Sequence, residues 1–70
     1  MKVLLWSSAG DTLLKEYDPA TADMSEVNAF IDEMEKQHYG RAFNLETGEQ
    51  IDRATPEDTE VHIVGPNAGG

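Results

Sequence analysis

Two apolar segments near the start of the chain predict a β-hairpin. Residues 2–6 form a mostly apolar run of strand length, and residues 12–17 form a second strand-length segment shortly afterwards. The segment between them contains Gly10, which takes positive φ angles without penalty, and Asp11, which can hydrogen-bond nearby backbone. This combination predicts two antiparallel strands joined by a turn.

Apolar residues then recur at spacings of three and four, which predicts an amphipathic helix of about four turns. Its expected inner face consists of Met24, Val27, Phe30, Ile31, Met34 and His38. Asp23 precedes Glu26 by three residues, the spacing of a capping box at a helix start. Gly40 is expected to end the helix, because glycine adopts the left-handed conformation that follows many helices.

After the helix, the pattern predicts a second hairpin. Residues 41–45 and 49–51 have strand-like composition and flank Glu46-Thr47-Gly48, a turn of the bulged type I kind. Residues 55–58 are expected to form a single helical turn, with Thr55 as the cap and Pro56 at the first position.

Residues 60–64 alternate in hydrophobicity and are expected to form the last strand, followed by a flexible tail over residues 65–70. The order β-β-α-β-β-β predicts an α+β fold: a mixed sheet of four to five strands with one helix packed across one face. The first and last strands are the most apolar, so we expect them to lie side by side in the centre, parallel to each other.

The sheet face away from the helix is expected to carry Lys2, Leu4, Trp6, His62 and Val64. This set is apolar for a solvent-facing surface. Two interpretations stay open: ordinary exposed apolar surface, or a partner-docking face formed by Leu4, Trp6, His62 and Val64.

Length and charge narrow the class of protein. The chain has 70 residues, which predicts one domain with a thin core and which we expect to be a monomer. Fourteen acidic and five basic residues give a net charge of -9, which argues against nucleic acid and anionic membrane as partners and favours a basic protein surface. No apolar run has the length of a membrane span, and the N-terminal run is too short for a signal peptide, so we expect a soluble cytoplasmic protein.

Candidate catalytic and metal-binding residues are few. The chain has no cysteine and two histidines, His38 and His62, and no nucleophile elbow surrounds Ser7 and Ser8. Two acidic clusters, Glu57-Asp58-Glu60 and Asp32-Glu33-Glu35, lack the ligand spacing of a calcium loop. We interpret these clusters as solvated acidic surface, and we expect no metal site and no enzymatic activity.

The final residues carry the most distinctive chemistry. Gly69 and Gly70 present a carboxylate with no neighbouring side chains, which can enter a narrow channel and expose its carbonyl carbon to a nucleophile. The stretch 56–70, with its acidic turn, Glu-Val strand start, Pro66 and terminal Ala-Gly-Gly, resembles the C-terminus of the molybdopterin-synthase small subunit family. The thiamine-pathway sulfur carrier and ubiquitin are similar to it in fold and in the Gly-Gly end.

The resemblance implies a ubiquitin-like β-grasp domain over residues 1–64, with residues 65–70 as a Gly-Gly tail. It implies a carrier or modifier in which an activating enzyme uses ATP to adenylate the Gly70 carboxylate, with Pro66, Asn67 and Ala68 contacting that enzyme. The adenylate would then yield a thiocarboxylate for sulfur transfer, or pass to a lysine amine of a target protein. No cofactor is expected to bind the domain itself.

A second hypothesis assigns no role to the two terminal glycines. In it the chain is a non-conjugated β-grasp adaptor or accessory subunit that binds a protein through its sheet face, with Trp6 as the first anchor to test. A small enzyme, or a designed or prophage-type domain, is a third and weaker hypothesis.

Overall fold

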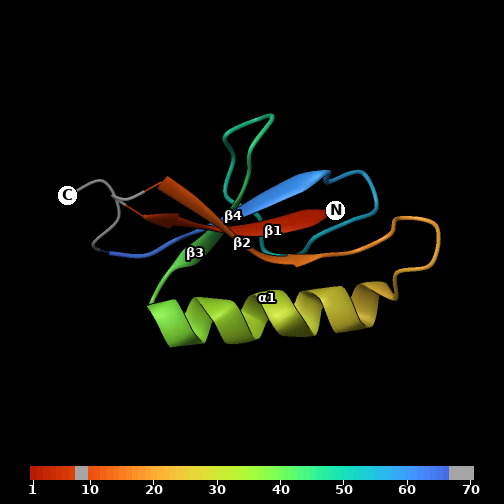
Figure 1. Cartoon of the computed structure of the whole chain (residues 1–70), viewed down its shortest axis with the longest axis horizontal. Coiled ribbons are helices and arrows are strands. Elements are labelled where there is room, and N and C mark those ends of the chain that lie inside the picture. Colours follow the sequence, from red (N-terminus) through yellow and green to blue (C-terminus); the bar gives the residue numbers. More distant parts are fainter. Residues whose placement is uncertain (8–9, 67–70) are drawn as a thin grey trace.

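A computed structural model describes residues 1–7 and 10–66 as one helix packed against one four-stranded sheet. The elements are β1 (Lys2–Ser7), β2 (Gly10–Glu16), α1 (Met24–His38), β3 (Arg41–Asn44) and β4 (Glu60–Val64). Figure 1 shows α1 lying along one side of the sheet. The predicted α+β class, the N-terminal hairpin and the single helix across one face are confirmed.

The strand order is β2-β1-β4-β3, so β1 and β4 are the central pair. They run parallel, with Val3 opposite Val61 and Leu5 opposite Ile63, while β2 and β3 pair antiparallel on either side. The predicted central, parallel arrangement of the first and last strands is therefore confirmed. A helical crossover makes it possible, because parallel strands need a long connection.

The core lies between the helix and this central pair. Val3, Val61 and Ile63 are fully buried on the sheet, and Val27 and Ile31 are buried on the facing side of α1. Strand alternation and helical periodicity thus bring two apolar surfaces together, as the spacing predicted. The half-buried Asn28 connects α1 to the loop at Ala54. Its side-chain oxygen accepts from the Ala54 N–H at 2.7 Å, and its side-chain amide donates to the Ala54 carbonyl at 3.1 Å.

The helix begins where the sequence predicted but ends differently. The Asp23 carboxylate accepts from the Ser25 N–H at 2.9 Å, which is the expected N-cap. At the other end Tyr39, rather than Gly40, adopts the left-handed conformation, with φ 53° and ψ 39°. The prediction that Gly40 supplies this conformation is wrong.

Gly40 is needed for space. A Cβ at Gly40 would lie 2.6 Å from the Val64 carbonyl oxygen, and one at Gly65 would lie 2.8 Å from the His38 carbonyl oxygen. Two glycines therefore let the end of α1 and the end of β4 cross with their backbones in contact. This close crossing fixes the C-terminal end of the helix against the sheet.

Two of the predicted elements after β3 are only partly formed. Residues 49–51 do not form a strand: Gln50 makes an isolated bridge to Phe43, and the Ile51 N–H bonds the Ala42 carbonyl at 2.9 Å. Residues 55–58 form a hydrogen-bonded turn rather than a helical turn, with the Asp58 N–H donating to the Thr55 carbonyl at 3.0 Å.

Asp58 also corrects the interpretation of its acidic cluster as solvated surface. The residue is buried, and its carboxylate accepts hydrogen bonds from the Thr55 N–H at 2.7 Å and from the Asn44 side-chain amide. These bonds connect the turn at residues 55–58 to the end of β3, and they supply the donors that a buried carboxylate needs. Glu57 in the same cluster is exposed, as expected.

Candidate functional site

The sheet face opposite α1, here called the open face, carries the residues that the sequence assigned to partner docking. Leu4 lies opposite His62, and Trp6 lies opposite Val64, on the parallel central pair. The structure therefore brings all four together on one face. The side chains of Leu4 and Val64 are half-buried, and that of Trp6 is 44% exposed.

The flanking strands extend this apolar surface with residues that sequence reasoning missed. β3 places Phe43 opposite His62, and β2 places Leu13 opposite Leu4. Leu13 is 51% exposed. Alternation along β3 could have assigned Phe43 to this face, but the strand order was needed to bring it beside His62.

A pocket of about 330 Å³ lies on the open face over β1, β4 and β3. Its apolar lining comes from Trp6, Phe43, Leu45 and Val64, and its remaining lining from Asn44, Gly48 and His62. It is a shallow apolar depression with few polar groups, the usual character of a site that accepts an apolar group.

The turn after β3 forms one wall of this pocket. The Asn44 side-chain oxygen accepts from the Glu46 N–H at 2.8 Å and from the Thr47 N–H at 3.1 Å. Gly48 then takes a positive φ of 72°, which glycine adopts without strain. The polar turn thereby holds Leu45 and Gly48 at the edge of an apolar pocket.

His62 forms the floor of the pocket and is the unusual residue of the open face. It is only 3% exposed, and Trp6 packs edge-on against it, with ring centroids 6.0 Å apart. Among the residues that the structure describes, neither ring nitrogen has a hydrogen-bond partner. The Asp11 carboxylate lies 3.9 Å from Nε2, which is too far for a hydrogen bond.

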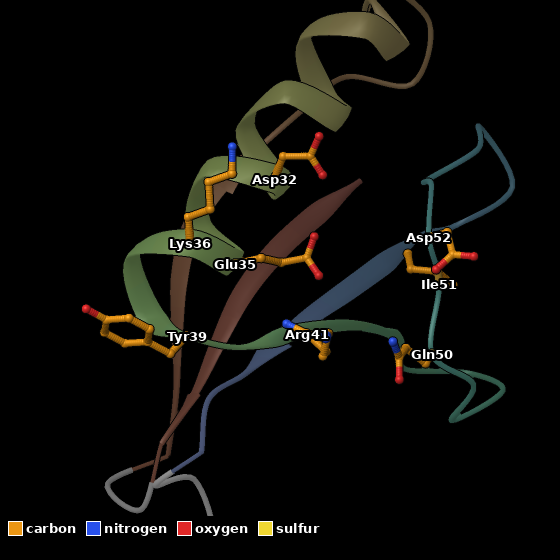
Figure 2. Close-up of a pocket in the computed structure, with 8 residues that line it drawn as sticks. All are labelled: Asp32, Glu35, Lys36, Tyr39, Arg41, Gln50, Ile51 and Asp52. Carbon is orange, nitrogen blue, oxygen red and sulfur yellow. The ribbon is translucent and has the colours of Figure 1, made fainter.

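A second pocket, of about 680 Å³, lies at the C-terminal end of α1 (Figure 2). It is lined by Asp32, Glu35, Lys36, Tyr39, Arg41, Gln50, Ile51 and Asp52. Figure 2 shows the carboxylates of Asp32 and Glu35 extending from the helix on the side of the loop that carries Asp52. Its lining mixes carboxylates with two cations, so it presents no single charge to a ligand.

Metal binding finds no support in either acidic cluster. Over residues 1–7 and 10–66, no group of three or more His, Asp or Glu side chains is arranged to hold a metal ion. Glu33 is exposed on α1, and His38 is half-buried at the helix end, beside the crossing with Gly65.

The predicted activation residues are only partly visible. Gly69, Gly70, Asn67 and Ala68 lie outside the described residues, whereas Pro66 is described and exposed. Gly65, assigned to the tail from its sequence, packs against the end of α1. The structure thus shows where the chain leaves the sheet.

Comparison with known proteins adds no relative: no family model, curated protein or solved structure matches the chain. Within the part of the chain that the structure describes, α1 is too short and too polar to cross a membrane.

Proposed function

We propose that this domain acts by binding a protein partner with a basic surface through its open face. The observation that carries the proposal is the cluster of exposed apolar side chains around the pocket, including Trp6, Leu13 and Leu45. They share one side of a small domain whose other sheet face is already covered by α1. Exposed apolar surface gathered in this way is typical of a docking site.

The charge of the chain selects the partner. With a net charge of -9, the domain repels acidic surfaces and attracts basic ones over a distance of about 8 Å at physiological salt. Complementary charge mainly accelerates encounter and rejects wrong partners. The apolar cluster would then supply most of the affinity.

Photo-crosslinking tests the docking surface. A photoreactive amino acid replaces Leu13, on the open face, or Gln37, an exposed residue of α1 that serves as the matched control. We expect discrete adducts with a basic protein in the native cell from position 13 and none from position 37. Equal adducts from both positions, or none from position 13, would overturn docking through this face.

A more specific role within this function is that of a ubiquitin-like β-grasp carrier or modifier. Its supports are the hairpin, the crossover helix and the parallel central strands, which are compatible with a β-grasp fold, and the Gly69-Gly70 sequence that follows β4. In this role the open face would dock the activating enzyme, and the tail would enter that enzyme's active site.

The chemistry would take place at Gly70. A carboxylate oxygen would attack the α-phosphorus of ATP and release pyrophosphate, giving an acyl adenylate. Hydrosulfide would then displace AMP and leave a thiocarboxylate. Alternatively, an enzyme cysteine would displace AMP, and a lysine amine would next displace that thiolate to form an isopeptide bond.

Intact-mass spectrometry of the protein from its native cell tests this role and also establishes whether the polypeptide ends in Gly70. A gain of about 16 Da, from replacement of oxygen by sulfur, supports the sulfur carrier. Gly-Gly remnants on lysines of other proteins support the modifier. An unmodified chain without such remnants, or a chain that continues past Gly70, leaves the adaptor function as the conclusion.

A further inference from the structure

His62 is a residue that the fold alone does not require. Its imidazole is buried on the open face, and neither ring nitrogen has a hydrogen-bond partner among the described residues. A buried polar group in this state loses its hydration without replacement. Leucine would fill a comparable space without that loss, so the imidazole calls for another explanation.

One of the side chains that cover His62 is itself exposed. Trp6 packs edge-on against the imidazole, and both residues line the pocket. Because the indole is 44% exposed, a change of its rotamer needs no rearrangement of the core between β1 and α1. Such a change would open the floor of the pocket to an incoming group.

The pocket and its surroundings determine the chemistry of that group. The walls supplied by Trp6, Phe43 and Val64 suit an aromatic ring, while the unpartnered imidazole below suits a hydroxyl that can donate or accept. Tyrosine combines both properties, and its hydroxyl needs a partner when it is buried.

The charges around the pocket point to a basic context for this tyrosine. The Asp11 carboxylate lies 3.9 Å from Nε2 of His62, whereas Glu46 and Glu49 of the neighbouring turn line a different pocket. Among the described residues that line the pocket there is no lysine or arginine, and the whole chain has a net charge of -9. Arg41 lines the pocket at the end of α1.

We propose that the pocket is the anchor site for a tyrosine of the partner, carried on a lysine- or arginine-bearing segment, and that His62 hydrogen-bonds its hydroxyl. This inference rests on the proposed docking function and makes it more specific. His62 then selects the partner, and the free domain carries an imidazole that is satisfied only in the complex.

Four peptides test the site by NMR titration of the ¹⁵N-labelled full chain. They are Ac-Lys-Lys-Tyr-Lys-Lys-NH2 and its variants with Phe or Ala in place of Tyr, and Ac-Glu-Glu-Tyr-Glu-Glu-NH2. We expect the basic tyrosine peptide to shift the resonances of the Trp6 indole, Phe43 and Gly48. It should bind about 3- to 10-fold more tightly than the phenylalanine peptide, the range expected for one hydrogen bond.

Substitutions separate a hydrogen-bonding role of His62 from a structural one. His62→Leu should bind the two aromatic peptides equally, and Phe43→Ala should weaken both, with the thermal unfolding midpoint showing that each variant folds. Tyr39→Ala is the matched control, because Tyr39 is an aromatic residue that is 82% exposed and lies outside this pocket. It should leave every affinity unchanged.

Three affinity results would overturn the anchor site. They are equal wild-type affinity for the tyrosine and phenylalanine peptides, a tyrosine preference that persists in His62→Leu, and absence of binding by every peptide at millimolar concentration. Shifts confined to Leu4 and Leu13 would also overturn it, while leaving docking on the open face intact. Docking itself is decided by the crosslinks from position 13.

Discussion

The two faces of the sheet are built from the same strands and are completed in different ways. On one face Val3, Val61 and Ile63 are fully buried against α1, together with Val27 and Ile31 of the helix. On the other face Trp6 and Leu13 remain substantially exposed, and the buried His62 has no hydrogen bond among the described residues. The helix buries the apolar side chains of the first face. The second face has exposed apolar side chains and an imidazole without a hydrogen bond, which a partner could cover and bond.

Adjacent residues of β4 show the difference most clearly. Ile63 is buried by the helix, and His62 is buried on the opposite side by neighbours that include Trp6. Burial of Ile63 stabilises the fold, because it removes apolar surface from water. A similar degree of burial at His62 lowers stability, because it removes hydrogen-bonding groups from water without replacing their bonds. Substitutions at these positions should change stability in opposite directions.

The largest expected effect is at the covered face. Ile63→Ala should lower the free energy of unfolding by about 2–5 kcal/mol, through lost burial and a residual cavity. Because a domain of this length has a total stability of only about 4–10 kcal/mol, Ile63→Val, with an expected loss of about 1 kcal/mol, provides the milder variant. Urea denaturation measures both, and losses below about 0.5 kcal/mol for both would contradict the central role of this contact.

The next effect concerns the crossing that holds the helix on the covered face. Gly40→Ala should destabilise by about 1–3 kcal/mol, because its Cβ would lie 2.6 Å from the Val64 carbonyl oxygen. Gly48→Ala is the control, since its Cβ would meet nothing within 4 Å and only the positive φ would disfavour it. If thermal unfolding shows that Gly40→Ala costs less than about 0.5 kcal/mol, close approach is not the reason for glycine at position 40.

A substitution on the open face should raise the free energy of unfolding rather than lower it. His62→Leu is expected to raise the free energy of unfolding by about 1 kcal/mol, because it removes a buried group without hydrogen bonds. The same variant should lose the preference for a tyrosine ligand. A marked loss of stability in His62→Leu would show that the imidazole supports the fold, and the contrast between the faces would then be wrong.

The smallest change in stability is expected for an exposed residue of the open face. Leu13→Thr should change stability by less than about 0.5 kcal/mol, because the side chain is largely exposed and threonine suits a strand. Chemical denaturation gives this value directly. A loss above 1 kcal/mol would show that Leu13 belongs to the core rather than to a docking surface.

The sequence predicted those parts of the fold that depend on local periodicity. The spacing of Val27 and Ile31 gave the inner face of the helix, and the alternation of His62 and Ile63 gave the two faces of β4. The prediction was wrong for residues 49–51, where strand-like composition yields one bridge at Gln50. Composition indicates what a segment tolerates, but pairing depends on the strand beside it.

The candidate site was predicted only in part, for the same reason. Alternation placed Trp6 and His62 on the open face, but it carries no information on burial by neighbouring strands. The pocket needs Phe43 and Leu45, which come to Trp6 and His62 only through the order of the strands. Tyr39 and Gly40 show the same limit, because the space available to Gly40 is set by Val64, far away in the sequence.

The pairing of β1 with β4 also has a consequence for how the protein is made. The β1–β2 hairpin and α1 consist of local contacts and can form as soon as they leave the ribosome. The inner sheet waits for residues 60–64, because nearly the whole described chain must close into a loop first. Until then β1 has an unpaired edge and the apolar side chains Val3 and Leu5 lack their partners on β4, so synthesis is the stage at which this domain is most exposed to aggregation.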